Sequence, residues 1–482
     1  MSEVSTSAAA RGCRRGVHWV VLLCVLSACK SLSEQRETDA AEVRSLVAVR
    51  GGQEPGAPPC DDTSIVPLAL ELLAAPLTDD SALRVALSNN RAVRRAFEEL
   101  GVASATLVQA SLIANPLFRA DVERFDSGTE IELSIAQPLL DLLFRGTRAE
   151  IGQARGAAER ARIARELIAL CFEVRRALLE VRAAESLLEI GRQSLAAADE
   201  ARALMADLHA AGNVMDRALT VEEIAAADAF LALEEARAAL AEARETLAVL
   251  LGIPNATLPW TVAGELGADP LAGLDLAALE ERAVDASLDL GESRALAEAD
   301  ARAAGITVGE RLLAAGEVGL AGKREAGAGE WGLGPALAAD VPLWNRGEAE
   351  RTAAEARLRA RLARQVELEV EIRSAARRVS ERLRSHGERV QFLRERALPL
   401  AARLVHETMQ SYNAMQIGAF DVLSTRREEL ATTGRHIAAL RGGWIARLDL
   451  EELLAGNYDA RVMEHTSSTQ TGEGRARADK EH

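Results

Sequence analysis

Apolar residues recur along much of the chain with a helical spacing. From residue 163 to residue 188 they step alternately by four and three positions, at Ile163, Leu167, Leu170, Val174, Ala177, Val181, Ala184 and Leu188. A sustained period of 3.5 residues is typical of helices that pair in a left-handed supercoil. No proline occurs between Pro138 and Pro254. The pattern therefore predicts a long antiparallel helical hairpin, with helices at about 144–211 and about 214–251.

A second pattern, strict alternation, precedes this hairpin. Apolar residues at 131, 133 and 135 alternate with polar residues at 130, 132 and 134, and residues 118, 120 and 122 alternate with 119, 121 and 123 in the same way. A strand that is apolar on one side and polar on the other, about ten residues long, is typical of a membrane-spanning strand. A soluble two-stranded ribbon packed on helices is the alternative. The glycine-rich stretch from Gly316 to Gly334 shows the alternation less clearly.

The same series of elements is predicted twice. The first half has a helix at about 79–114, two strands within about 117–137 and the long hairpin. The second half has a helix at about 275–315, two strands within about 316–341 and a hairpin of helices at about 346–416 and about 419–455. Matching residues recur at an offset of about 200–206 positions, as in the pairs Pro138 and Pro342, Gly146 and Gly347, Gly212 and Gly418, and Asp216 and Asp421. The chain is therefore expected to be mainly α with a small β part, and internally duplicated.

The segments outside the repeats differ in composition, which sets the domain boundaries. Gly51, Gly52 and several prolines within 29–78 predict an extended N-terminal tether, and the polar residues of 457–482 predict a disordered tail. The expected domains are a signal peptide at 1–28, the tether at 29–78, a first repeat at 79–256, a linker at 257–274, a second repeat at 275–456 and the tail at 457–482.

The N-terminus predicts export. Three arginines between residues 11 and 15 precede an apolar run from Val17 to Ala28, which is about 12 residues long and so has the length of a signal-peptide core. Small residues before Cys29 resemble a lipoprotein processing site, and Cys29 is then the acylated first residue of the mature protein. An ordinary secretory signal with an incidental cysteine is the alternative. Lys30 favours sorting to the outer membrane.

Composition narrows the class of protein. Aromatic residues make up only 3% of the chain and there are 13 prolines, as expected for long helices rich in Ala, Leu, Glu and Arg. The net charge of −16 gives no support for nucleic-acid binding. No apolar stretch of 18 residues follows the signal, so any membrane crossing is expected through strands. Four strands cannot close a barrel and open edges are excluded from lipid, so membrane strands require several copies of the chain.

The motifs together resemble the TolC-like outer-membrane efflux protein family. Three places carry the resemblance: the strand-to-helix passage Val341-Pro342-Leu343-Trp344-Asn345-Arg346-Gly347; the series Leu398-Pro399, Tyr412, Gly418 and Asp421-Val422-Leu423; and Ala86-Leu87, Asn89-Asn90 and Asn115-Pro116. Pro138 marks the matching passage in the first half. The resemblance covers about residues 79–456. The chain departs from the family pattern at Asn90, where a proline is frequent.

The resemblance implies an architecture and a set of partners. It implies a homotrimer in which twelve strands form a barrel in the outer membrane above an α-helical barrel in the periplasm. It also implies docking to a periplasmic adaptor protein and an inner-membrane efflux pump. The form of the Pro342, Asn345 and Gly347 motif resembles the heavy-metal-efflux branch of the family.

Catalytic chemistry is not predicted. The glycine-rich sequence Gly327-Ala328-Gly329-Glu330-Trp331-Gly332 lies between two predicted strands, so a strand-connecting turn is favoured over a dinucleotide loop. The histidines are scattered, and there is no paired-cysteine or zinc-protease motif. His209 and His406 lie toward the hairpin tips, where solvated histidines are favoured over contacts with a metal cargo. We therefore expect no enzyme activity, no cofactor and no metal site.

The expected function is a passive conduit with a gate. Contacts that close the periplasmic end must be breakable, and the candidates near the hairpin tips are Asp207, Asp216, Arg217, Tyr412, Gln416 and Asp421. Helix capping explains Asp216 and Asp421 equally well. Gly212 and Gly418 are expected to reverse the chain where an adaptor docks. A type I secretion channel and a non-membrane periplasmic coiled-coil scaffold are the alternative functions.

Overall fold

A computed structural model describes most of the chain, in two compact units. The described residues are 32–56, 65–126, 128–254, 258–312, 316–325, 330–338 and 348–458. The first unit comprises residues 1–42, 99–156 and 302–352, and the second comprises residues 43–98, 157–301 and 353–482. The predicted signal segment with Cys29, the motif residues Pro342, Asn345 and Gly347, and the predicted tail from residue 459 lie outside the described residues.

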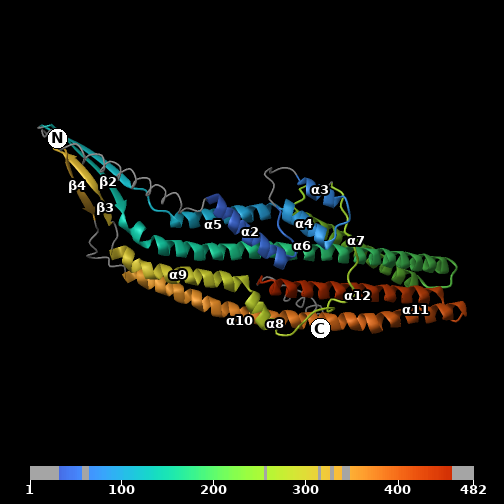
Figure 1. Ribbon diagram of the computed structural model, residues 1–482. Coiled ribbons are helices and arrows are strands. Elements are labelled where there is room, and N and C mark those ends of the chain that lie inside the picture. The colour runs from blue at the N-terminus through green and yellow to red at the C-terminus, as the bar shows by residue number, and fades with distance from the viewer. Residues whose placement is uncertain are drawn as a thin grey trace, which may run out of the picture. The chain divides into compact units, whose positions relative to one another are not determined.

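The order of elements agrees with the predicted series of helices and strands, although the helices expected at about 79–114 and about 275–315 are each divided into two helices (Figure 1). The helices are α2 (Leu32–Gly51), α3 (Pro67–Leu73), α4 (Asp79–Asn89), α5 (Arg91–Ser111), α6 (Leu139–Ala210), α7 (Asp216–Leu251), α8 (Leu279–Ala286), α9 (Leu288–Leu312), α10 (Glu348–Phe392), α11 (Leu398–Asn413) and α12 (Ala419–Leu454). The strands are β1 (Leu117–Phe125), β2 (Gly128–Pro138), β3 (Glu317–Arg324) and β4 (Gly332–Ala338). The prediction of a mainly helical chain with a small β part is confirmed.

The prediction of an extended tether at 29–78 is wrong for two of its segments. Residues 32–51 form α2 and residues 67–73 form α3. Val43 and Val47 of α2 are fully buried, and Arg175 donates a hydrogen bond of 2.9 Å to the carbonyl oxygen of Gly51 at the end of α2. The prolines of this region lie beyond residue 54, so the residues before them form a helix that buries apolar side chains.

The long helix of the second repeat differs from its prediction in one place. A single helix was expected at about 346–416, but α10 ends at Phe392, a π-helical turn spans Leu393–Ala397, and α11 follows with Pro399 near its start. The amide of Leu398 donates to the carbonyl of Leu393 in this turn. Proline lacks an amide hydrogen and its ring crowds the preceding turn, so the wider π turn accommodates it.

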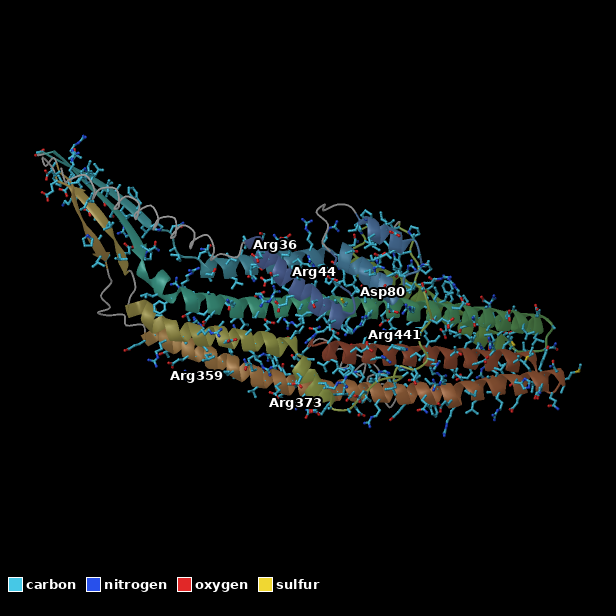
Figure 2. All side chains as sticks on the ribbon, viewed as in Figure 1. Arg36, Arg44, Asp80, Arg359, Arg373 and Arg441 are labelled. Carbon is cyan, nitrogen blue, oxygen red and sulfur yellow. The ribbon has the colours of Figure 1, made fainter. Side chains whose placement is uncertain are left out.

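Helix α12 is the centre of the second unit. Its small residues Gly442 and Gly443 lie against His386 of α10, and its apolar residues form clusters with α10, as in Leu450 with Leu383. On its opposite face, Arg441 pairs with Glu180 of α6 through two hydrogen bonds of 2.6 and 2.9 Å. Figure 2 shows Arg441 between the ribbons of α12 and α6. Within this unit, α12 therefore lies between α10 and the α6–α7 hairpin.

A buried ionic cluster joins α12 to its neighbours. Arg176 of α6 pairs with Asp449 at 3.0 Å and also with Glu452, and Arg382 of α10 pairs with Asp449 at 3.1 Å. Both carboxylates are at most 5% exposed. Burial raises the pKa of Glu452, and the guanidinium of Arg176 opposes that rise. Asn457 donates a further hydrogen bond to Glu452. Buried charges of this kind depend on their partners, because an unpaired buried charge is costly.

Replacing Arg176 with leucine is expected to destabilise the fold in a pH-dependent way. At pH 7 the loss is about 3 kcal/mol, since Glu452 is left buried and unpaired. Its folded-state pKa then rises further above the unfolded value. The penalty is therefore absent below the unfolded pKa and grows as the pH rises through the folded pKa. Urea unfolding at pH 7 and pH 4 measures this. Arg192→Leu, which breaks an exposed pair with Glu189, is the control and is expected to cost less than about 0.5 kcal/mol.

Candidate functional site

The four strands of the first unit form one antiparallel sheet in the order β1-β2-β3-β4. Alternate residues of a strand point to opposite faces, and residues paired across strands share a face. The register places Phe118 opposite Ile135, Ile135 opposite Leu320, and Gly322 opposite Leu333. One face of the sheet, here called the apolar face, therefore carries Phe118, Ala120, Val122, Ile131, Leu133, Ile135, Val318, Leu320, Leu333 and Leu337.

The apolar face is exposed. Phe118 is 68%, Leu320 64% and Leu333 84% accessible. No charged side chain lies on this face between Phe118 and Val122 or between Val318 and Leu320, and Arg124 and Arg324 lie at one end of the face. The glycine-rich strands β3 and β4 continue the apolar face with Val318, Leu320, Leu333 and Leu337, whereas the opposite face of β4 carries only glycine and alanine. A contiguous exposed apolar surface of this kind indicates contact with lipid or with another apolar surface.

The opposite face, here called the charged face, is polar along its middle. Arg119 of β1 pairs with Glu317 of β3 at 3.1 Å, and Lys323 of β3 pairs with Glu130 of β2 at 2.6 Å. The other acidic residues that the register places on this face are Asp121, Glu123 and Glu132. The two faces thus differ sharply in polarity, as the alternation in the sequence predicted.

The sheet has two free edges among the described residues. β1 pairs only with β2, and β4 pairs only with β3, in the part of the chain that the structure describes. Pro138 ends β2 opposite Glu317, and α6 begins at the next residue. Pro138 therefore marks the predicted passage from strand to helix. β3 and β4 pair as antiparallel neighbours, and residues 326–329 of the glycine-rich sequence between them lie outside the described residues.

The two helical hairpins of the second unit turn with the same hydrogen-bond pattern. At the first tip, the amides of Ala211, Gly212 and Asn213 donate to the carbonyls of residues 207, 209 and 208. At the second tip, the amides of Ala414, Met415 and Gln416 donate to the carbonyls of residues 410, 412 and 411. The offset is 203 residues throughout. This is the Schellman ending of a helix, which places one residue in the left-handed conformation.

The residue in that conformation differs from the prediction at the second tip. Gly212 has φ +73°, but its counterpart is Met415, with φ +57°. Gly418, which was expected to reverse the chain, has φ −83°, an ordinary value for any residue, and lies at the start of α12. The sequence alignment of Gly212 with Gly418 is therefore three positions out. The side chain of Met415 is 93% exposed.

The predicted gate residues all lie near the two tips and are exposed. Asp207 is in the last turn of α6, Arg217 follows Asp216 in the first turn of α7, and Tyr412 and Gln416 flank the second turn. Asp216 contacts His209 at 2.6 Å, and the residue before α7 makes no side-chain capping bond. Asp421 accepts a hydrogen bond of 3.1 Å from the amide of Gly418, so it does cap α12.

One contact near the tips was missed by sequence reasoning. Glu222 of α7 is only 2% exposed and pairs with Arg427 of α12 at 3.1 Å. This ion pair joins the two hairpins about two turns from their tips. No local sequence pattern marks Glu222 or Arg427, because the two residues lie 205 positions apart and meet only in the folded chain.

The described residues contain no cluster of three or more His, Cys, Asp or Glu side chains that could bind a metal ion. His209 contacts Asp216, and His406 lies 3.1 Å from the side chain of Gln410. Among the helices of the described part, none is both long enough and apolar enough to cross a membrane.

Comparison with known proteins supports the fold. No protein-family model matches the chain. The cobalt-zinc-cadmium resistance protein CzcC of Cupriavidus metallidurans is 28% identical over 245 residues, which cover 46% of this chain and 56% of that protein. The match thus spans little more than half the length of this curated relative.

Solved structures match over most of the chain. The structure of CusC, described with transmembrane channel formation, has a TM-score of 0.62 at 16% identity and covers 79% of this chain and 92% of that chain. The outer-membrane protein VceC of Vibrio cholerae has a TM-score of 0.60 at 16% identity, over 79% and 97% of the two chains. A membrane protein from Pseudomonas aeruginosa has a TM-score of 0.65 at 18% identity, over 84% and 96%.

These likenesses confirm the resemblance to TolC-like outer-membrane channels. The chain has their fold. The proteins it resembles are channel and membrane proteins rather than enzymes, which agrees with the prediction of no catalytic activity.

Substitutions at the two left-handed positions are expected to change the free energy of unfolding in opposite directions. Met415→Gly is expected to raise the free energy of unfolding by about 1 kcal/mol, because glycine adopts a left-handed backbone without steric cost. Gly212→Ala is expected to lower it by about 1 kcal/mol for the same reason. Urea unfolding of the two variants measures both. A loss of stability in Met415→Gly would contradict the left-handed assignment.

Proposed function

We propose that this chain, which has the fold of the TolC-like channels, is the outer-membrane channel of an efflux system. The carrying observation is the sheet, whose exposed apolar face suits lipid and whose charged face suits a water-filled lumen. In this proposal the strands lie in the outer membrane and the long helices extend into the periplasm. Cys29 carries a lipid anchor.

The chain functions as a homotrimer. The free edges of β1 and β4 leave backbone groups that lipid cannot satisfy, so the edges must pair with other copies. Three copies supply twelve strands that close on themselves. The exposed apolar residues of α7 and α10, such as Ile224 and Val366, likewise favour contact between copies.

The helices provide a conduit and the tips provide closure and docking. A periplasmic adaptor protein binds the two turns at Gly212 and at residues 414–418, and an inner-membrane pump drives the substrate through. The channel itself conducts passively. The gate candidates named above lie where closure is needed, and the pair of Glu222 with Arg427 holds the hairpins together behind them.

The likeness to a cobalt-zinc-cadmium resistance protein favours metal ions as the transported substrate. A type I secretion channel uses the same surfaces with a different cargo, and identifying the pump distinguishes the two. A non-membrane scaffold is disfavoured, because it has no use for an exposed apolar sheet face.

A pair of neighbouring substitutions tests the membrane assignment. Leu320→Arg places a charge on the apolar face and is expected to cost about 2–4 kcal/mol if that face meets lipid. Ala321→Arg places the same charge on the opposite face and is expected to be tolerated. The measurement is the amount of native trimer recovered from the outer-membrane fraction. Equal recovery of the two variants, or a soluble wild-type monomer after signal processing, would refute the channel.

Two substitutions at Asp421 separate gating from capping. Asp421→Ala is expected to raise channel conductance in planar bilayers, because it removes both the charge and the bond to the Gly418 amide. Asp421→Asn keeps an oxygen that accepts this bond and removes only the charge. If conductance rises in both variants, the charge of Asp421 holds the gate closed. If conductance rises only in Asp421→Ala, the hydrogen bond that caps α12 holds it closed. Unchanged conductance in both removes Asp421 from the gate.

A further inference from the structure

Three side chains with different donor atoms lie at the tip of the first hairpin. His209 is in the last turn of α6, Met215 is the residue before α7, and Asp216 is the first residue of α7. The turn that joins the two helices, green in Figure 1, is closed by backbone hydrogen bonds around the left-handed Gly212. The turn therefore holds an imidazole, a thioether and a carboxylate close together at one end of the hairpin.

Two of these donors converge across the turn. The Nε2 atom of His209 lies 2.6 Å from the Oδ1 atom of Asp216. The sequence alone favours a solvated histidine at this position, because it does not show that a carboxylate from the next helix faces the ring. The contact brings together a nitrogen and an oxygen donor that both bind divalent metal ions.

Fastening of the turn is the simpler explanation for this contact. The two side chains are 38% and 95% exposed, and ion pairs at such exposed positions contribute little stability because water screens them. The turn is also closed by its own backbone hydrogen bonds. The same exposure that makes the pair a weak fastening leaves both donor atoms accessible to an ion from solution.

Met215 adds a soft donor beside this pair. Its side chain is 79% exposed, although contact of a large apolar side chain with water is unfavourable. Thioether sulfur is a ligand for soft metal ions. Four of the six methionines in the chain lie close to the two hairpin turns, and only the first of the four is buried: Met205, Met215, Met409 and Met415.

The donor set indicates the class of ion. Imidazole and carboxylate bind borderline divalent ions, and a thioether shifts the preference toward softer ones, of which Cd²⁺ is an example. The described residues contain no cluster of three or more His, Cys, Asp or Glu that would form a closed metal site. An open set of three exposed side chains, completed by water, binds an ion weakly and releases it. Weak binding of this kind is what conduction of an ion requires.

We propose that His209, Met215 and Asp216 form a transient binding site for a borderline-soft divalent cation at the tip of the first hairpin. This inference rests on the proposed function and adds the residues that the transported ion meets at the periplasmic end. The ion lies between Nε2 of His209 and Oδ1 of Asp216, and the imidazole keeps its proton on Nδ1. Bonds of about 2.1 Å to the ion require these two atoms to be roughly 3 Å apart, so the side chains move only slightly.

The second tip has similar residue types in a different arrangement. His406 and Met409 are exposed on α11, but the Nε2 atom of His406 lies 3.1 Å from the side-chain amide of Gln410 rather than beside a carboxylate. The second tip therefore provides a matched control, with the same donors but without the convergence seen at the first tip.

Metal binding by the full-length protein in detergent tests the site. Equilibrium dialysis against Cd²⁺ and against Zn²⁺, with the bound metal measured by mass spectrometry, gives the affinity for each ion. His209→Gln and Asp216→Asn are each expected to weaken one site per chain about tenfold for both ions, because each removes a donor. Met215→Leu is expected to weaken binding of Cd²⁺ by about threefold or more and to leave Zn²⁺ binding unchanged, since sulfur is the soft donor.

The control variant carries His406→Gln with Met409→Leu and is expected to bind both ions as the wild type does. Other donors, such as the thiol of Cys60, are the same in every variant and cancel in the comparison. Circular dichroism checks that each variant folds. If His209→Gln and Asp216→Asn bind Cd²⁺ like the wild type, their contact only fastens the turn and the site is refuted. An unchanged preference for Cd²⁺ in Met215→Leu refutes the thioether as a ligand.

Current through planar bilayers relates the site to the channel. Cd²⁺ added on the side of the hairpin tips is expected to block the wild-type current reversibly, and His209→Gln is expected to require about tenfold more Cd²⁺ for the same block. Equal sensitivity of the two proteins would show that the site lies outside the conduction path and would overturn its role in transport. A wild type that conducts no current refutes the proposed function, whereas a conducting wild type with no binding difference in dialysis refutes the site alone.

Discussion

One constraint governs the rest of the structure: a single copy of the sheet supplies neither hydrogen-bond partners for its two edge strands nor a cover for its apolar face. Four strands in the order β1-β2-β3-β4 leave two rows of backbone groups unpaired among the described residues, and one face exposes side chains such as Leu320 and Leu333. Exposing the apolar side chains of this face to water is unfavourable, and exposing the unpaired backbone groups of the edges to lipid is also unfavourable. In the proposed channel, lipid covers the apolar face and other copies pair with the edges, so both requirements are met. On this proposal, the alternation in the sequence sets both the environment of the sheet and the need for assembly.

The helical unit meets a different demand, which is length without a globular core. Helix α6 buries a row of apolar side chains such as Ile163 and Phe172, and close approach and ionic contacts join the helices further. Small residues such as Gly442 and Gly443 let α12 approach α10, and the cluster around Glu452 attaches α12 to α6. Burial raises the pKa of Glu452. Its ionised form is therefore tolerated only because Arg176 is present, and such a cluster fixes the register of the helices more than it adds stability.

Much of this arrangement could be predicted from the sequence, because its patterns are long and periodic. The strands at 117–138 and the helix ends at the first tip agree with expectation to within a few residues, since alternation and the absence of proline are strong local signals. Errors arose where the decisive fact was local geometry or a distant partner. The tether was misjudged because its average composition concealed a proline-free stretch that forms α2. The second turn was misaligned because glycine was assumed to occupy the left-handed position that Met415 fills. The pair of Glu222 with Arg427 joins residues far apart in the sequence, and no local pattern indicates it.

The tips of the two helical hairpins have the same backbone hydrogen bonds but differ in their side chains. Identical hydrogen bonds close both turns, so the backbone imposes no difference between them. At the first tip glycine occupies the left-handed position without strain, His209 lies beside Asp216, and Met215 is exposed. At the second tip the strain is kept, and a large thioether side chain projects almost entirely into solvent. Strain that glycine would remove is usually retained where the side chain itself has a use. The two turns therefore share their backbone hydrogen bonds, and they differ in which residue occupies the left-handed position.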